Sequence, residues 1–131
     1  WSLLLRTKAD IINFDAWSYF DRFSIYREAI SGFLSRGGIL AWGIVPTSEF
    51  TGAETLETLK GKFENSVGEL ARIVDRKVIL ERSILTPSCG MALMPLPLAE
   101  KAMRLLGELS RVLRGKYFTA ESGERSPRCL R

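Results

Sequence analysis

Histidine is absent from the sequence, and this absence limits the chemistry that the chain can perform. Without histidine there is no Ser-His or Cys-His pair to activate a nucleophile and no imidazole to bind a metal ion. Cysteine occurs only at Cys89 and Cys129, and two cysteines at unrelated spacing form no disulfide framework. A reduced, cytoplasmic setting is therefore expected.

Long apolar runs are also missing, because no stretch approaches the roughly 18–20 residues that a membrane-spanning helix needs. The three leucines at positions 3–5 are too few for the core of a signal peptide. Since the first residue is not methionine, we expect the chain to begin inside a longer reading frame. Glycine-rich phosphate loops are absent as well, and the pair Gly37-Gly38 is interpreted as a helix stop.

What the chain does contain is typical of one globular domain. It has 131 residues, of which 46% are hydrophobic and 26% are charged. The net charge of +4 is modest, and no basic stripe is interleaved with aromatic residues. Neither nucleic acid nor a membrane is therefore an expected partner. We expect one domain over residues 1–116, followed by a polar, disordered tail over residues 117–131.

Apolar periodicity predicts three short strands that alternate with helices. The strands are expected over residues 10–15, 39–45 and 83–86. The main helices are expected over residues 23–36, from near residue 54 to residue 74, and over residues 98–113, with a short helix capped by Asp75 before the last strand. Strands that alternate with helices form parallel sheets, but three strands cannot close a barrel. The predicted fold class is α/β, as part of a (β/α)8 barrel or as a small open sheet.

Polar or reactive residues stand where these strands end. Asp15 closes the first strand, Thr47 follows the second, and Ser88 and Cys89 follow the third. In both architectures the functional site lies at the carboxyl ends of the strands. Because the ends of parallel strands meet at one edge of the sheet, we expect Asp15, Thr47 and Cys89 to lie within the width of one pocket.

Three stretches of the sequence resemble a known family: ADIINFDAW, GGILAWGIVPT and ILTPSCGMALMPLPLAEKAMRLLGELSRVLR. Together they resemble the carboxyl-terminal barrel of cobalamin-independent methionine synthase and its shorter relatives in the uroporphyrinogen decarboxylase/methionine synthase superfamily. The resemblance covers residues 1–114 and is most specific in the Pro-Ser-Cys-Gly turn at residues 87–90. It implies that the chain carries the last three βα units of a (β/α)8 barrel and is a partial chain.

The resemblance also implies a zinc-dependent methyltransferase. The family binds zinc through a histidine, two cysteines and a glutamate, and Cys89 matches the last of the cysteines. Asp15 falls where the acid belongs, as an aspartate in place of glutamate. The histidine and the first cysteine would lie before Trp1. Cys89 and Asp15 are thus the implied metal ligands and catalytic residues, and Asp15, Thr47 and Ser88 are the implied substrate contacts.

Zinc chemistry accounts for a cysteine at that position. A thiol near neutral pH is mostly protonated, and zinc deprotonates a bound substrate thiol while leaving it able to attack a methyl group. The implied reaction moves a methyl group from a folate, or from a corrinoid that a corrinoid protein can carry, to a thiol such as homocysteine. The 131-residue piece alone is expected to be inactive, because it supplies at most two of the ligands.

The same residues also have simpler interpretations. Taken alone, Cys89 is better explained as a small buried side chain, and Asp15 can be explained as a helix cap. Trp42, in the middle of an apolar strand, is predicted to lie in the core. A second function hypothesis is a metal-free barrel of the decarboxylase branch, or a non-catalytic relative that binds a ligand or a protein.

Overall fold

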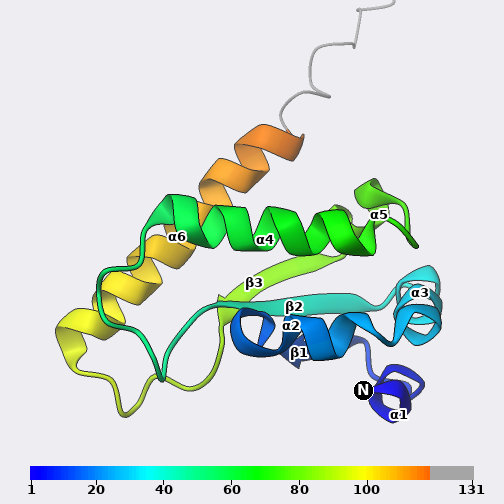
Figure 1. The fold of residues 1–131 in the computed structure, drawn as a ribbon, viewed down its shortest axis with the longest axis horizontal. Helices are drawn as coiled ribbons and strands as arrows, with labels where there is room; N and C mark the ends of the chain where they lie inside the picture. Colours follow the sequence, from blue (N-terminus) through cyan, green and yellow to red (C-terminus); the bar gives the residue numbers. More distant parts are fainter. Residues whose placement is uncertain (119–131) are drawn as a thin grey trace, which may run out of the picture.

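The protein is described by a computed structural model over residues 1–118, in which one parallel sheet carries a layer of helices (Figure 1). The strands are β1 (Ile11–Phe14), β2 (Ile39–Val45) and β3 (Ser83–Pro87). The helices are α1 (Ser2–Leu5), α2 (Ala16–Ser24), α3 (Arg27–Ser35), α4 (Leu56–Leu70), α5 (Arg76–Glu81) and α6 (Leu96–Phe118). The alternation of strands and helices confirms the α/β class.

The sheet has the strand order β1-β2-β3, and both pairings are parallel. Phe14 of β1 lies beside Trp42 of β2, and Trp42 in turn lies beside Leu85 of β3. A register shift between Gly43 and Val45 marks the carboxyl end of β2. The prediction of three adjacent parallel strands in chain order is therefore confirmed.

The core lies between the sheet and the helices and is centred on Trp42, which is fully buried as predicted. Its ring centroid lies 5.3 Å from that of Phe14, 6.0 Å from Phe20 in α2 and 5.3 Å from Phe63 in α4. Its Nε1 donates a hydrogen bond to Ser83 Oγ at 2.8 Å, so the polar edge of the ring is satisfied. Helices α2 and α4 thus cover the same face of the sheet.

Within residues 1–118, no layer of helices covers the opposite face of the sheet. Along β1 the burial alternates, with Ile12 and Phe14 in the core and Asn13 exposed. On β3, Ile84 is 42% exposed. Asn13 Nδ2 donates to Thr86 Oγ1 at 3.0 Å, which joins β1 to β3 across the middle strand. A doubly wound sheet would instead have helices on both faces.

The predicted helix over residues 23–36 is wrong in its start and in its continuity. Helix α2 already begins at Ala16, because Asp15 caps it by accepting a hydrogen bond from Ser18 N–H at 2.8 Å. The helix ends at Ser24, and Tyr26, with φ −87° and ψ 47°, separates it from α3. Gly37 ends α3 as predicted, with a φ of 95° that favours glycine.

Helix α6 is longer than the predicted helix over residues 98–113, since it continues to Phe118. Its last turn is fixed to α4, where Glu64 Oε1 accepts hydrogen bonds from Lys116 Nζ at 2.6 Å and from Tyr117 OH at 2.8 Å. The bond from Lys116 holds the pKa of Glu64 below its ordinary value, and the same bond raises the pKa of Lys116. Residues 119–131, most of the predicted tail, lie outside the described residues.

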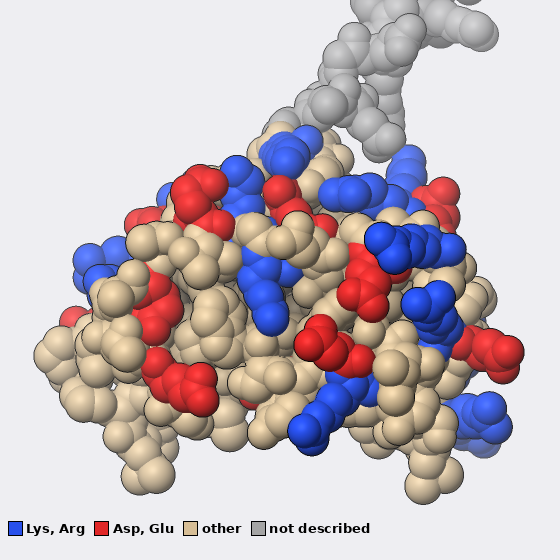
Figure 2. All heavy atoms as spheres, viewed as in Figure 1, with Lys and Arg blue, Asp and Glu red and all other residues tan. Residues whose placement is uncertain are grey.

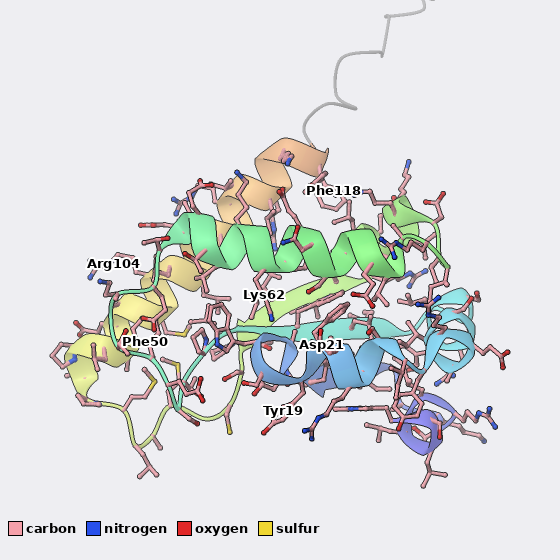
Figure 3. The ribbon with its side chains drawn as sticks, in the orientation of Figure 1. Tyr19, Asp21, Phe50, Lys62, Arg104 and Phe118 are labelled. Carbon is pink, nitrogen blue, oxygen red and sulfur yellow. The ribbon has the colours of Figure 1, made fainter. Side chains whose placement is uncertain are left out.

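Acidic and basic side chains are interspersed on the face of the molecule that Figure 2 shows. Lys62 points from α4 toward α2 (Figure 3), where its Nζ lies 5.9 Å from the centroid of the Trp17 ring. Within residues 1–118, no helix combines the length and the hydrophobicity that crossing a bilayer requires.

Candidate functional site

The carboxyl ends of the three strands are joined by a small set of polar contacts. Asp15 directly follows β1, Thr47 lies two residues beyond β2, and Ser88 directly follows β3. Ser88 Oγ accepts a hydrogen bond from Thr47 N–H at 3.2 Å and lies 3.2 Å from Thr47 Oγ1. Ser88 N–H donates to the carbonyl of Val45 at 2.8 Å. The ends of β2 and β3 are therefore fixed to each other, and the Thr47 side chain is buried between them.

Gly43 lets all three strand ends approach one another. A Cβ atom at this position would lie 2.8 Å from the Phe14 carbonyl oxygen, 2.8 Å from Ser88 Cα and 3.2 Å from Asp15 Cα. All three atoms belong to the backbone of the neighbouring strands or of the residues that follow them. No side chain other than hydrogen fits here without moving β1 or β3, so the position of Asp15 relative to Ser88 depends on Gly43.

Asp15 is first of all a helix cap. Its Oδ1 accepts from Ser18 N–H at 2.8 Å, and its carbonyl accepts from Tyr19 N–H at 3.1 Å, as an N-cap residue does. Within residues 1–118 its other carboxylate oxygen, Oδ2, accepts no hydrogen bond. The simpler interpretation of Asp15 is thus confirmed, and one oxygen is left to contact a ligand.

A cleft of about 130 Å³ opens at this edge of the sheet. Its lining comes from the start of α2, from the loop after β2 and from the turn after β3: Asp15, Trp17, Ser18, Tyr19, Pro46, Thr47, Ser48, Glu49 and Ser88. The cleft is smaller than the several hundred Å³ that enclose a whole ligand. With two carboxylates and several hydroxyls in its lining, it suits one small cationic group, such as an amino group.

Cys89 stands just outside this cleft. It is exposed and carries a free thiol, so its interpretation as a small buried side chain is wrong. It follows Ser88, which lines the cleft, but Cys89 itself does not line it. Beyond it, Met91 and Met94 pack against the core while Leu93 is fully exposed. The structure therefore brings Asp15, Thr47 and Ser88 together in the cleft, while Cys89 is exposed and is not part of the lining.

The described residues alone do not fit a complete zinc site. Within residues 1–118, no group of three or more cysteine, aspartate and glutamate side chains lies close enough to hold a metal ion. Catalytic zinc sites use three protein ligands and keep one open position. Cys89 and the free oxygen of Asp15 would supply two donors at most.

The loop between β2 and α4, which begins at this edge, is organised by Glu54. Its carboxylate accepts hydrogen bonds from Thr51 N–H at 3.0 Å, from Thr51 Oγ1 at 3.1 Å and from Gly52 N–H at 2.8 Å. Partial burial alone would raise the pKa of Glu54, but these hydrogen bonds outweigh it and bring the pKa below its ordinary value. Lys101 of α6 donates to the Gly52 carbonyl, which ties the loop to the last helix.

Sequence reasoning missed Asn13 and Tyr19. Asn13 lies on the open face, near the strand ends, and its bond to Thr86 spans the sheet. The sequence could have indicated it, because Asn13 is the polar residue in a strand of alternating burial and so faces away from the core. Tyr19, which lines the cleft, is 48% exposed and projects from α2 on the side away from α4 (Figure 3). It was missed because the start of α2 was placed too late.

No family model matches the chain, and comparisons with curated proteins and with solved structures found no match either.

Proposed function

We propose that the chain is a segment of a (β/α)8 barrel methyltransferase, in which Cys89 is a zinc ligand at the carboxyl edge of the sheet. The reaction transfers a methyl group from a folate or a corrinoid to a thiol such as homocysteine. The observation that carries the proposal is an exposed thiol in the Pro-Ser-Cys-Gly turn, directly beside the polar cleft at the strand ends.

The barrel part of the proposal is supported by the arrangement of strands and helices. Within residues 1–118 the strands are parallel and in chain order, and helices cover one face of the sheet. A wall of a (β/α)8 barrel has the same arrangement. The open face, with Asn13, Ile84 and Thr86, would then be the inner face. In such barrels the site lies at the carboxyl ends of the strands, where Asp15, Thr47 and Ser88 meet.

The chain's own residues have distinct roles in this proposal. The Cys89 thiol can ligate a metal as a thiolate, and its exposure leaves it accessible to one. When bound, zinc would supply deprotonation of the substrate thiol. The cleft beside it would hold the amino group of the substrate through Asp15, with the Thr47 and Ser88 hydroxyls orienting it. Since two donors are too few for catalytic zinc, the remaining ligands would come from outside residues 1–118.

The second candidate is a metal-free decarboxylase-like barrel or a non-catalytic relative that only binds a ligand. The capping bond from Ser18 N–H favours it, because one oxygen of Asp15 is already engaged in holding α2. In that case the cleft binds a small cationic group without a metal, and Cys89 takes no part in binding. Substitution of Cys89 separates the two candidates.

Zinc titration with thiol alkylation tests the proposal on the 131-residue chain. We expect zinc to bind weakly and to slow alkylation of Cys89 by iodoacetamide, as read by mass spectrometry of the labelled peptides. Cys89→Ser should abolish the weak binding, because a hydroxyl is a poor replacement for thiolate. Cys129→Ser is the matched control and should leave it unchanged. Zinc binding that survives Cys89→Ser would contradict the assignment.

Methyl transfer is tested in a chain that supplies the remaining zinc ligands of the proposed barrel. There we expect methyl transfer from methyltetrahydrofolate or methylcobalamin to homocysteine, and its loss in Cys89→Ser. The 131-residue chain alone should show no transfer. Retained transfer in the Cys89→Ser variant would remove Cys89 from the site and favour the metal-free candidate.

A further inference from the structure

The turn after β3 is bonded to the end of β2 through both the backbone and the side chain of Ser88. Ser88 N–H donates to the Val45 carbonyl at 2.8 Å, and Ser88 Oγ accepts from Thr47 N–H at 3.2 Å. Ser88 Oγ also lies 3.2 Å from Thr47 Oγ1, where either hydroxyl can donate. The turn and the loop after β2 accordingly lie side by side beyond the strand ends (Figure 1).

These contacts restrict the rotation of the Ser88 backbone. The bond from Ser88 N–H fixes the nitrogen but leaves rotation about the N–Cα bond free. The contacts at Oγ lie on the other side of Cα, and the side chain is confined to staggered rotamers, so the two sets of contacts together restrict φ to few values. The ring of Pro87 fixes the φ angle of the preceding residue as well. The direction in which the chain continues to Cys89 is therefore set by contacts with β2.

Thr47 is a rigid partner for Ser88 because it is buried, with an exposed fraction of 6%. The backbone of Ser88 also lies close against β2, since a Cβ atom at Gly43 would be 2.8 Å from Ser88 Cα. Both sides of the contact are thus held by the packing of the strand ends.

The far end of the turn is anchored too. Met91 and Met94 pack against the hydrophobic core, and Met94 N–H donates to the Met91 carbonyl at 3.0 Å. Between Ser88 and Met91 the chain has two residues, Cys89 and Gly90, and both are exposed. Two residues between fixed ends have a narrow range of backbone conformations. The thiol is therefore exposed on a restrained backbone.

We propose that Ser88 and Thr47 are positioning residues for Cys89, which hold its backbone in one conformation and so direct its thiol. A ligating group that is already fixed in position loses less conformational entropy when it binds. The use of the directed thiol as a ligand rests on the proposed function, whereas the restraint of the turn does not.

The alternative is that the two residues only satisfy buried polar groups. The N–H and hydroxyl of buried Thr47 need partners whatever residue follows Ser88. In that case, loss of the Ser88 hydroxyl would lower the stability of the whole domain and leave the motion of the turn unchanged. The two explanations therefore differ in local motion.

Backbone amide order parameters from NMR relaxation of the 131-residue chain measure this motion. In the parent chain we expect about 0.85 for the Cys89 amide, as in rigid backbone. Ser88→Ala removes both contacts at Oγ and should bring this value below about 0.6, the range of flexible segments. The matched control is Ser24→Ala, which removes another buried hydroxyl, one that donates to the Asp21 carbonyl at 3.2 Å. It should leave the Cys89 amide at the parent value.

Two substitutions of Thr47 make the test graded. Thr47→Val removes the hydroxyl but keeps the N–H that donates to Ser88, so the order parameter of Cys89 should lie between those of the parent chain and Ser88→Ala. Thr47→Ser keeps the hydroxyl and should match the parent chain. If Ser88→Ala does not fold, the difference between these two variants decides the question alone.

Three results would overturn the proposal: a Cys89 amide that is already flexible in the parent chain, a parent-like value in Ser88→Ala or in Thr47→Val, or an equal loss in Ser24→Ala. The last result would assign the motion to general destabilisation. None of these measurements involves zinc. Failure of zinc to protect Cys89 from alkylation would contradict the proposed function and leave the expected order parameters unchanged.

Discussion

Substitution of Gly43 by alanine should loosen the strand ends and destabilise the whole domain. The added methyl group would lie 2.8 Å from the Phe14 carbonyl oxygen and 2.8 Å from Ser88 Cα. Since both atoms are backbone, the clash cannot be relieved by turning a side chain, and β1 or the turn after β3 has to move away from β2. Overpacking a core typically costs 1–3 kcal/mol, and two backbone clashes at once place Gly43→Ala at the upper end, about 3 kcal/mol.

Urea denaturation followed by far-ultraviolet circular dichroism measures this cost. The matched control is Gly61→Ala in α4, where an added Cβ has no heavy atom within 4 Å. Because alanine is the better helix former, the control should gain about 1 kcal/mol of unfolding free energy. The same chemical change thus has opposite effects at the two positions, and only the surroundings of the methyl group differ.

Two results would refute this explanation of Gly43. If the free energy of unfolding of Gly43→Ala lies within about 0.5 kcal/mol of that of the parent chain, the strands do not approach Gly43 this closely in solution. A variant that loses stability but keeps its cleft would also contradict the reasoning, because Asp15 and Ser88 are positioned by the same contact. Crosslinking between cysteines introduced at Ser18 and Ser48, both of which line the cleft, reads that second property.

Three smaller perturbations test other contacts. Asp15→Ala removes the cap of α2 and should lower the free energy of unfolding by about 1 kcal/mol, as measured by thermal unfolding. Asp15→Asn keeps a capping oxygen and should stay close to the parent chain. Equal losses of stability in the two variants would refute capping as the cause. The pKa of Glu54 is lowered in the folded state, so its hydrogen bonds to the loop stabilise the fold fully above the ordinary glutamate pKa of about 4.3. This stabilisation is lost as the pH falls through the lower pKa of the folded state. Glu54→Gln should therefore be less stable than the parent chain at pH 7, and the difference should shrink as the pH falls through the lowered pKa of Glu54, in denaturant titrations at each pH. Gly37→Ala forces a side chain into a φ of 95° and should cost about 1–2 kcal/mol, with unfolding by urea as the measurement.

Much of the fold follows from local patterns in the sequence. The apolar stretch of β2 and the Gly37-Gly38 stop are signals that need no knowledge of distant residues, and both occur where they were expected. The start of α2 was missed because its first turns are rich in Trp, Tyr and Phe, which are weak helix formers. The cap at Asp15 and the packing of Phe20 and Phe23 in the core override that weakness.

The candidate site was predictable only in outline. Parallel strands bring their carboxyl ends to one edge, and this rule alone places Asp15, Thr47 and Ser88 in one cleft. That Cys89 is exposed and is not part of the lining depends on the path of the turn after β3, which no local pattern specifies. The bond from Asn13 to Thr86 depends on the register of three strands, and so it emerges only once the sheet is assembled.

The order of the strands has a consequence for how the molecule forms. Each strand pairs with the strand nearest to it along the chain, so no pairing has to wait for a remote segment to be synthesised. Each pairing still closes a long loop, since Ile11 pairs with Ile39 and Leu40 with Ser83, so both should form more slowly than a hairpin does. We expect the sheet to grow as the chain leaves the ribosome, with β1 and β2 joining around Trp42 before β3 is added. The last strand to arrive is then the one whose outer edge stays available longest.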